Sequence, residues 1–143
     1  MASTHDYEID SRNEDIMIYI NGQFFHRSDA KVSVMDSGYL LGDGVWEGIR
    51  LYKGTLIHLD QHLDRLYHGA KAIAMDIDQT KQQMELAIRS TLEKNKMTTD
   101  VHIRLIVSRG IKITPYQDPK VTIGKPTLVI IPEYKKASEQ VKI

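Results

Sequence analysis

The chain has 143 residues, which suits one domain with one hydrophobic core. Its 19 basic and 19 acidic side chains balance, so a general field for nucleic acid or membranes is not expected and any charged site must be local. The sequence has no cysteine, which excludes disulfides, thiolate zinc sites and cysteine nucleophiles and is compatible with a cytoplasmic location. No apolar run approaches the roughly 20 residues needed to span a bilayer.

The first part of the chain contains short predicted strands. Residues 1–15 are polar and acidic without an apolar stretch, so they are not a signal peptide and we expect a flexible polar tail. Asn21-Gly22, the strongest short-range hairpin signal, joins predicted strands over residues 16–20 and 23–26. Residues 32–35 are expected to form another short strand.

Residues 36–67 pack several elements together with no spare residues. A glycine-rich loop comes first and needs unusual backbone angles or close backbone approach. The next predicted strand covers residues 45–52, in which even and odd positions face opposite ways, so Trp46 and Arg50 share one face and Glu47 lies on the other. A hairpin turn follows, and Asp60 is expected to cap a helix. Such density is typical of a site held by rigid elements.

Two consecutive helices are predicted next. The first covers residues 60–75, where apolar residues recur at helical spacing. Arg65 lies nearly opposite the centre of this stripe, and the small residues Gly69 and Ala72 follow it one and two turns later. Small residues there indicate that something packs close to Arg65. The second helix covers residues 80–95 and begins with capping-box spacing.

The last part of the chain returns to strands. Residues 101–107 alternate cleanly between apolar and other side chains, whereas the proline-rich residues 111–126 predict a long, functional loop. A final apolar strand is expected over residues 127–131, closed by Pro132, before a polar end. We therefore predict an α+β fold, with two helices packed on a mostly antiparallel sheet.

Three arginines are candidates for an anion site. If their strands share a sheet, Arg50 and Arg104 could line one surface with Trp46, because guanidinium groups bind carboxylates and phosphates bidentately. The alternative is two solvated charges on an outward face. Arg65 lies near the positive end of its helix, where it could bind a phosphate, or it could pair locally with Gln61 or Asp64, or simply be exposed.

The histidines and acids give weaker signals. No third ligand accompanies His58 and His62, so a metal site is not expected. Asp36 and Asp43 are expected to serve turns by bonding nearby amides, although paired catalytic carboxylates are the alternative. Glu47 lies on a face shared with apolar residues, which favours structural pairing over catalysis.

Three segments together resemble the class IV, or fold type IV, pyridoxal-phosphate aminotransferases. The segments are residues 19–23, residues 30–50, which contain Gly-Asp-Gly-Val-Trp-Glu-Gly-Ile-Arg, and residues 59–66, which contain a His-x-x-Arg pair. This family includes branched-chain aminotransferases, D-amino acid transaminases and R-selective amine transaminases. The resemblance runs from about residue 16 to residue 131. It implies pyridoxal 5'-phosphate as cofactor, and amino acids and 2-oxo acids as substrates.

The resemblance also implies roles for particular residues. Arg65 corresponds to the family's ligand for the cofactor phosphate. The expected substrate-binding residues come from the strand face, from the loop before it and from the segment after the strand over residues 101–107: Tyr39, Leu41, Trp46, Arg50, Arg104 and Arg109. Leu41 stands where branched-chain enzymes tend to have a tyrosine. The loop with Tyr39 often reaches the partner subunit's pocket, so a homodimer is expected, with neither nucleic acid nor membrane as partner.

Family members are about twice as long as this chain. The lysine that holds the cofactor and the acid that faces the pyridine nitrogen are both expected after Ile143, and Lys142 is too early for that role. We therefore expect residues 16–132 to be an N-terminal aminotransferase domain without catalytic residues of its own, and residues 133–143 to begin an interdomain segment. Such a chain would be inactive alone. The alternative is a stand-alone, non-enzymatic module that binds a small anion or a partner.

Overall fold

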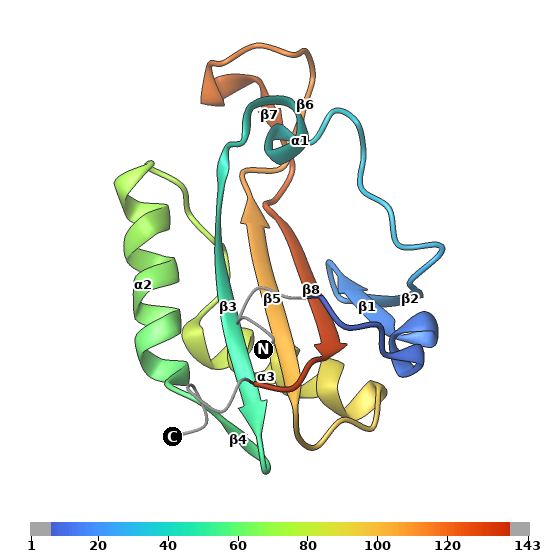
Figure 1. The fold of residues 1–143 in the computed structure, drawn as a ribbon. Helices are drawn as coiled ribbons and strands as arrows, with labels where there is room; N and C mark the ends of the chain where they lie inside the picture. The colour runs from blue at the N-terminus through green and yellow to red at the C-terminus, as the bar shows by residue number, and fades with distance from the viewer. Residues whose placement is uncertain (1–6, 138–143) are drawn as a thin grey trace.

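The computed structural model describes residues 7–137, and its centre is a six-stranded sheet (Figure 1). The strands lie in the order β2-β1-β8-β5-β3-β4, and every neighbouring pair is antiparallel. Their bounds are β1 (Met17–Ile20), β2 (Gln23–His26), β3 (Gly44–Tyr52), β4 (Thr55–Leu56), β5 (Val101–Ser108) and β8 (Thr127–Tyr134). The predicted α+β fold with a mostly antiparallel sheet is confirmed.

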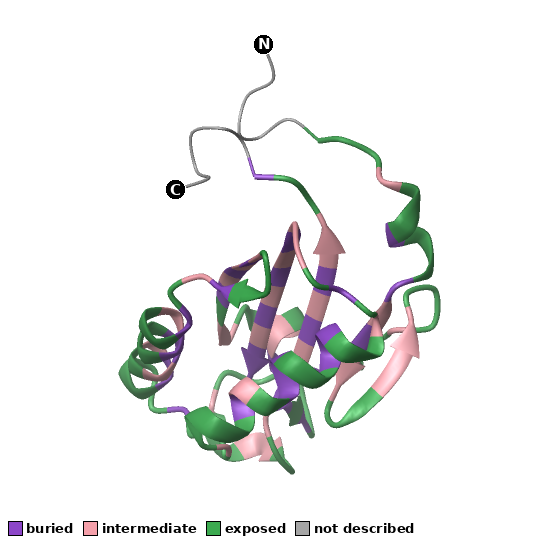
Figure 2. Cartoon of the chain, turned by 90° about the horizontal axis from the view of Figure 1, so that it is seen from below, coloured by how far each residue is buried: buried purple, intermediate pink, exposed green. Residues whose placement is uncertain are grey.

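Three α-helices accompany the sheet, rather than the two expected: α1 (Ser37–Leu41), α2 (Leu59–Ala72) and α3 (Lys81–Lys94). Helix α2 lies beside β3, whereas α3 lies behind the sheet and contacts β1 and β8 (Figure 1). The core between sheet and helices contains alternate side chains of β5, such as Ile103 and Leu105, and helix residues such as Leu66 and Ile88. Figure 2 shows this alternation as buried and half-buried bands along the strands.

The segment before β3 differs from the prediction. Residues 32–35 form no strand, and the glycine-rich loop contains the short helix α1. The Oδ1 of Asp36 accepts a hydrogen bond from the Gly38 amide at 2.8 Å and so caps the helix, while Gly42, with φ of 66°, ends it. The Oδ2 of Asp36 accepts a bond from the Thr127 hydroxyl at 2.6 Å, which ties α1 to the start of β8.

The two long helices begin in different ways. Helix α2 begins at Leu59 with His58 in the left-handed region and without a side-chain cap, so the prediction that Asp60 caps it is wrong. Helix α3 begins with the expected capping box, in which Thr80 and Gln83 exchange bonds of 3.1 and 2.9 Å. The cap position is His58, two residues before the predicted Asp60, so the aspartate lies inside the first turn of α2.

Strand β8 continues through Pro132 to Tyr134, so the prediction that the proline closes it is wrong. Strand β1 pairs with β8 only at Val129 and Ile130, which leaves the later part of β8 with a strand neighbour on one side alone. A proline is tolerated where a strand has a free edge, because its missing N–H then removes no ladder bond.

The ends and the long loop are more structured than expected. Within the predicted tail, Ser11–Asp15 forms a 3-10 helix, η1, whose Asn13 side chain exchanges two hydrogen bonds with the backbone of Tyr134 at 3.0 and 2.7 Å. Residues 1–6 and 138–143 lie outside the described residues. The loop over residues 111–126 contains β6 (Ile111–Lys112), η2 (Pro119–Val121) and β7 (Thr122–Ile123). Across residues 7–137, no helix is long and apolar enough to cross a membrane.

Candidate functional site

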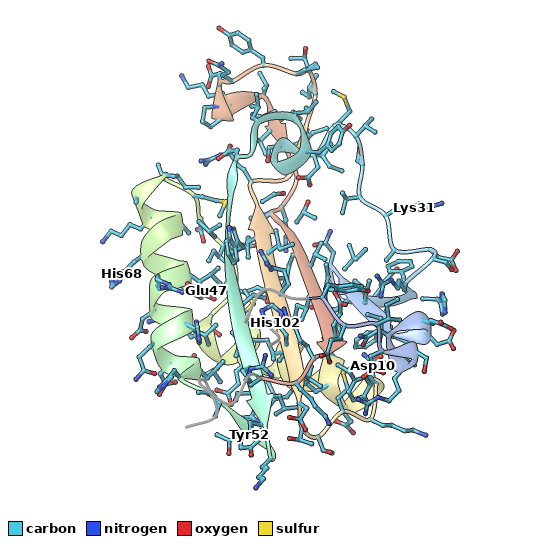
Figure 3. The ribbon with its side chains drawn as sticks, viewed as in Figure 1. Asp10, Lys31, Glu47, Tyr52, His68 and His102 are labelled. Carbon is cyan, nitrogen blue, oxygen red and sulfur yellow. The ribbon has the colours of Figure 1, made fainter. Side chains whose placement is uncertain are left out.

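The first candidate cluster lies between β3 and α2 and contains Glu47, His62 and Arg65. Glu47 is an odd-numbered residue of β3 and therefore faces the core side of the sheet. Its side chain is 2% exposed. Arg65 donates from Nε and Nη2 to the two carboxylate oxygens at 2.5 and 2.7 Å. The Nδ1 of His62, one turn earlier on α2, lies 2.9 Å from Oε2. Figure 3 shows Glu47 in this position between strand and helix.

Arg65 itself remains largely accessible, with 75% of its side chain exposed. It pairs with neither Gln61 nor Asp64; Asp64 instead accepts a bond from Lys81 at 2.6 Å. The helix starts at Leu59, so Arg65 lies well beyond the first turn, where the helix dipole has little effect. The guanidinium is therefore a cation held by Glu47 rather than one placed at a helix terminus.

The close packing expected near Arg65 comes from Gly69. A Cβ at position 69 would lie 3.3 Å from the Cγ1 of Val45, so the glycine lets α2 approach β3. Ala72 is exposed and takes no part in this contact.

The pKa of Glu47 is lowered from its ordinary value, mainly because Arg65 donates to the carboxylate, with His62 adding to the effect against the opposing effect of burial. Glu47 is therefore an ionised acceptor, fixed by its neighbours and unsuited to act as a general acid. The expected structural pairing of Glu47 is present in the structure.

The second candidate cluster lies on the opposite face of β3. Trp46 is 60% exposed, and the Arg104 guanidinium lies 4.0 Å from the centre of its ring. Arg104 comes from the adjacent strand, where it is the cross-strand partner of Gly48. The cation and the ring thus form one surface, as expected for Trp46 and Arg104.

Arg50 lies on the same face but is engaged elsewhere. Its Nη1 donates to the Lys135 carbonyl at 2.7 Å, and burial lowers its pKa. Opposite Arg50 in the register is His102, whose Nε2 lies 2.8 Å from where a Cβ on Gly48 would be. The ring of His102, labelled in Figure 3, therefore occupies the space above Gly48.

This contact predicts the effect of adding one methyl group to the face. In Gly48→Ala the new Cβ must displace the imidazole of His102, and we expect a loss of about 2 kcal/mol in the free energy of unfolding. In the His102→Ala background the same substitution should cost less than about 1 kcal/mol. Urea unfolding of the four proteins measures this; equal costs in both backgrounds would contradict the contact.

A second prediction concerns pH. Burial lowers the pKa of His102 from 6.5 to about 4, and Arg104, Lys135 and Arg50 add to the shift. Between these values the unfolded chain binds a proton that the folded chain does not, so stability falls as the pH drops from about 6.5 to about 4. Allowing for solvent screening, we expect His102 to account for about 1–2 kcal/mol of this loss in the free energy of unfolding. His102→Gln should flatten the pH dependence of unfolding in this window, and an unchanged slope would contradict the assignment.

Tyr39 and Leu41 project from α1 and are 74% and 41% exposed. Tyr39 lines a hollow of about 370 Å³ that also includes Ile106, the cross-strand partner of Trp46, and Val129 of β8. Leu41 does not line this hollow. A larger hollow of about 520 Å³ lies at the end of α2 and contains none of the predicted site residues.

Arg109 forms its hydrogen bonds outside both clusters. Its Nε and Nη2 donate to the carboxylate of Asp43 at 2.6 and 3.2 Å, and further bonds reach the carbonyls of Ile73 and Ala74 at 2.6 and 3.1 Å. Its side chain is only 12% exposed. These donors connect the end of β5 to the end of α2 and to the segment before β3, and a substrate role for Arg109 stays a prediction. Asp43 is correspondingly an ion-pair partner rather than a turn residue.

Known proteins share the sequence of this region. The model of the family "Amino-transferase class IV" matches residues 44–142, which include β3, α2 and β5. The chain belongs to the class IV aminotransferase family. It is 47% identical to a putative branched-chain-amino-acid aminotransferase of Methanocaldococcus jannaschii over 114 residues, covering 80% of this chain and 38% of that protein. Identity to a D-alanine aminotransferase of Staphylococcus epidermidis is 30% over 126 residues, or 87% of this chain and 44% of that protein.

Solved class IV structures share the fold. The branched-chain amino acid aminotransferase from Escherichia coli has a TM-score of 0.71 at 25% identity and covers 83% of this chain and 41% of its own. The T.th. branched-chain enzyme complexed with N-(5'-phosphopyridoxyl)-L-glutamate has a TM-score of 0.69 at 25% identity, over 82% of this chain and 40% of its own. This class IV chain thus spans about two-fifths of the length of such relatives.

Class IV aminotransferases use pyridoxal phosphate, and the first cluster fits one end of that group. Two of the five guanidinium N–H donors of Arg65 bind Glu47, and the others have no protein acceptor among residues 7–137. Accessible guanidinium donors suit a phosphate. No group of three or more histidine, aspartate or glutamate side chains within residues 7–137 could hold a metal ion.

Two residues of this class IV chain belong to clusters that the sequence did not reveal. The sequence favours a surface or capping role for His62, although its one-turn separation from Arg65 is visible there. For His102 the sequence indicates only a place on the alternating face, because the register of β5 on β3 is what brings its ring over Gly48.

Proposed function

We propose that this chain is the N-terminal part of a class IV aminotransferase that moves an amino group between an amino acid, or an amine, and a 2-oxo acid. The observation that carries the proposal is the accessible guanidinium of Arg65, held bidentately by a buried carboxylate. The family model matches both α2, which contains Arg65, and β3, which contains Glu47.

Arg65 would hold the phosphate of pyridoxal 5'-phosphate through its remaining N–H donors. When bound, this cofactor supplies an electron sink for negative charge at the amino acid's α-carbon. The chain's own residues bind and orient: Arg65 fixes one end of the ligand, and the Trp46–Arg104 surface offers an aromatic face and a cation to a substrate carboxylate. The lysine that holds the cofactor covalently is expected beyond Ile143, so the chain alone would be inactive.

Tyr39, Leu41 and Arg50 extend this proposed substrate surface, with Tyr39 beside the hollow next to Ile106. The proposed substrate class is that of the branched-chain or the D-amino acid and R-amine groups, in keeping with the relatives' names. A homodimer and a cytoplasmic location stay predictions from the family resemblance.

The alternative of a non-enzymatic module depends on Arg50 and Arg104 acting as a pair. Arg50 instead donates to the Lys135 carbonyl and Arg104 lies over Trp46, so no described contact favours a shared two-arginine anion site. The transaminase proposal therefore has the stronger support.

The test compares the 143-residue chain with the product of the complete gene, whatever its length. With pyridoxal phosphate and borohydride, we expect stoichiometric labelling of one lysine in the complete product and no specific labelling in the 143-residue chain. The complete product should also convert amino donors to 2-oxo acids. Stoichiometric labelling of one lysine in the shorter chain would contradict the proposal, as would a complete product that lacks transamination.

Arg65→Ala in the complete product should weaken the affinity for the cofactor far more than it lowers the stability of the fold. Two charged hydrogen bonds to a phosphate correspond to roughly a hundredfold loss in affinity. The Glu47 carboxylate would lose one partner but keep His62, and water can take the place of the largely exposed Arg65 side chain, so the loss of stability should be smaller than at Arg109, whose side chain is largely buried. Cofactor titration and thermal unfolding measure the two effects; a variant that loses stability yet retains cofactor normally would make Arg65 structural.

A further inference from the structure

The ion pair between Arg65 and Glu47 is unusually one-sided. The side chain of Glu47 is 2% exposed and that of Arg65 is 75% exposed. In the nearby pair Lys81–Asp64 both partners are open to solvent, at 49% and 55%. An ion pair between two surface side chains does not require a buried acid. A buried, fixed carboxylate can instead hold an exposed arginine in one orientation.

Glu47 supplies such a support. Its backbone is fixed in the ladder opposite Leu105 of β5, so the carboxylate has a defined position below α2. Both oxygens are occupied: Oε1 accepts from the Nε of Arg65, and Oε2 accepts from Nη2 and lies 2.9 Å from the Nδ1 of His62. With these neighbouring donors in place, the carboxylate cannot rotate without breaking a bond.

The bidentate contact also decides which donors of Arg65 remain. It uses the edge of the guanidinium formed by Nε and Nη2, so Nη1 and the outer N–H of Nη2 point away from Glu47. These donors lie together on the side of the planar group that faces away from the carboxylate. Because Glu47 already holds that edge, a ligand that binds Arg65 pays a smaller entropy cost for ordering this long side chain.

We propose that Glu47 is a positioning residue, which orients the guanidinium of Arg65 so that its outer donors receive the phosphate of a phosphorylated cofactor. His62 completes the support by binding the second carboxylate oxygen. The inference rests on the proposed function, because that function assigns the phosphate to Arg65. It adds that Arg65 keeps its bond to Glu47 when phosphate binds, rather than exchanging one partner for the other.

Binding of pyridoxine 5'-phosphate to the 143-residue chain tests the proposal, with pyridoxine as the unphosphorylated reference. This probe has no aldehyde to react with lysines, and isothermal titration calorimetry measures its affinity for the chain. Arg65→Ala should weaken binding of the phosphorylated probe about a hundredfold and Glu47→Gln, which leaves Arg65 in place, about tenfold, both without effect on pyridoxine. Asp64→Asn, at the adjacent exposed position, is the matched control and should change the affinity less than about twofold.

The double variant separates positioning from direct contact. If Glu47 acts through Arg65, Glu47→Gln has no further effect in the Arg65→Ala background. An undiminished effect there, or a normal affinity in folded Glu47→Gln, overturns this inference alone while leaving Arg65 as the phosphate ligand. A normal affinity in Arg65→Ala, or an unchanged chain that fails to prefer the phosphorylated probe, overturns both this inference and the proposed function.

Nitrogen-15 NMR of the unchanged chain gives a measurement that needs no substitution. The Nε–H of Arg65, bonded to Glu47 at 2.5 Å, should give a slowly exchanging signal both before and after the phosphorylated probe is added. Signals from the Nη groups should shift on binding. Loss of the Nε–H signal when the probe binds would mean that Arg65 leaves Glu47, which overturns the proposal even if Glu47→Gln fails to fold.

Discussion

Replacing Arg109 with alanine is expected to lower the free energy of unfolding by about 3 kcal/mol, because the substitution strands a partly buried carboxylate. Asp43 and Arg109 have side chains only 20% and 12% exposed, and they are joined by bonds of 2.6 and 3.2 Å. The carbonyls of Ile73 and Ala74, at the end of α2, would lose a donor as well. Urea unfolding monitored by circular dichroism measures the change.

The matched control is Arg89→Ala, which breaks an exposed ion pair between Arg89 and Glu85 on α3. Exposed helical pairs contribute about 0.3–0.5 kcal/mol, so this variant should unfold nearly as the unchanged chain does. Equal stability of the two variants would show that the contacts of Arg109 contribute no more than an exposed pair. Asp43→Asn should reproduce most of the effect of Arg109→Ala.

Gly110→Ala is expected to cost about 3–4 kcal/mol, through backbone strain and a collision together. Gly110 has φ of +111°, which side chains rarely adopt, and a Cβ there would lie 2.5 Å from the Lys125 carbonyl oxygen. That oxygen belongs to the backbone at the far end of the loop over residues 111–126, so it cannot move aside as a flexible side chain could. Chemical unfolding measures the loss.

Gly54→Ala separates strain from collision. Gly54 has φ of +81° with nothing within 4 Å of the added Cβ, so this variant carries only the conformational cost of about 1 kcal/mol. A cost at Gly110 no larger than that at Gly54 would mean that the loop from Lys125 relaxes freely. The difference between the two variants is therefore a measure of how firmly the loop over residues 111–126 is attached to the end of β5.

The sequence predicted the strand faces well, because alternation is a local property. The period of β3 placed Trp46 and Arg50 together and Glu47 opposite, and the register then brought Arg104 onto the ring of Trp46. Helical spacing likewise placed Arg65 away from the core stripe of α2. These inferences needed only the period of each element.

Contacts between distant segments were not predicted. No spacing rule connects Arg109 to Asp43 or Arg50 to Lys135, since these pairs form only when β5, β3 and the end of β8 are assembled. The cap of α2 and the continuation of β8 past Pro132 were wrong for a related reason. Local propensity favoured a capping aspartate and a terminating proline, whereas the neighbouring elements determined where helix and strand begin and end.

The alternation of β3 has a consequence for how such a protein can diversify. Glu47 holds the Arg65 guanidinium, which we propose faces the phosphate, while Trp46 and Gly48, its immediate neighbours, belong to the other side of the same strand. Substitutions at even positions are therefore expected to alter the proposed substrate surface and leave the proposed cofactor anchor intact. Inserting or deleting one residue within the strand would exchange the two sets at once, so we expect sequence drift here by replacement and not by change of length.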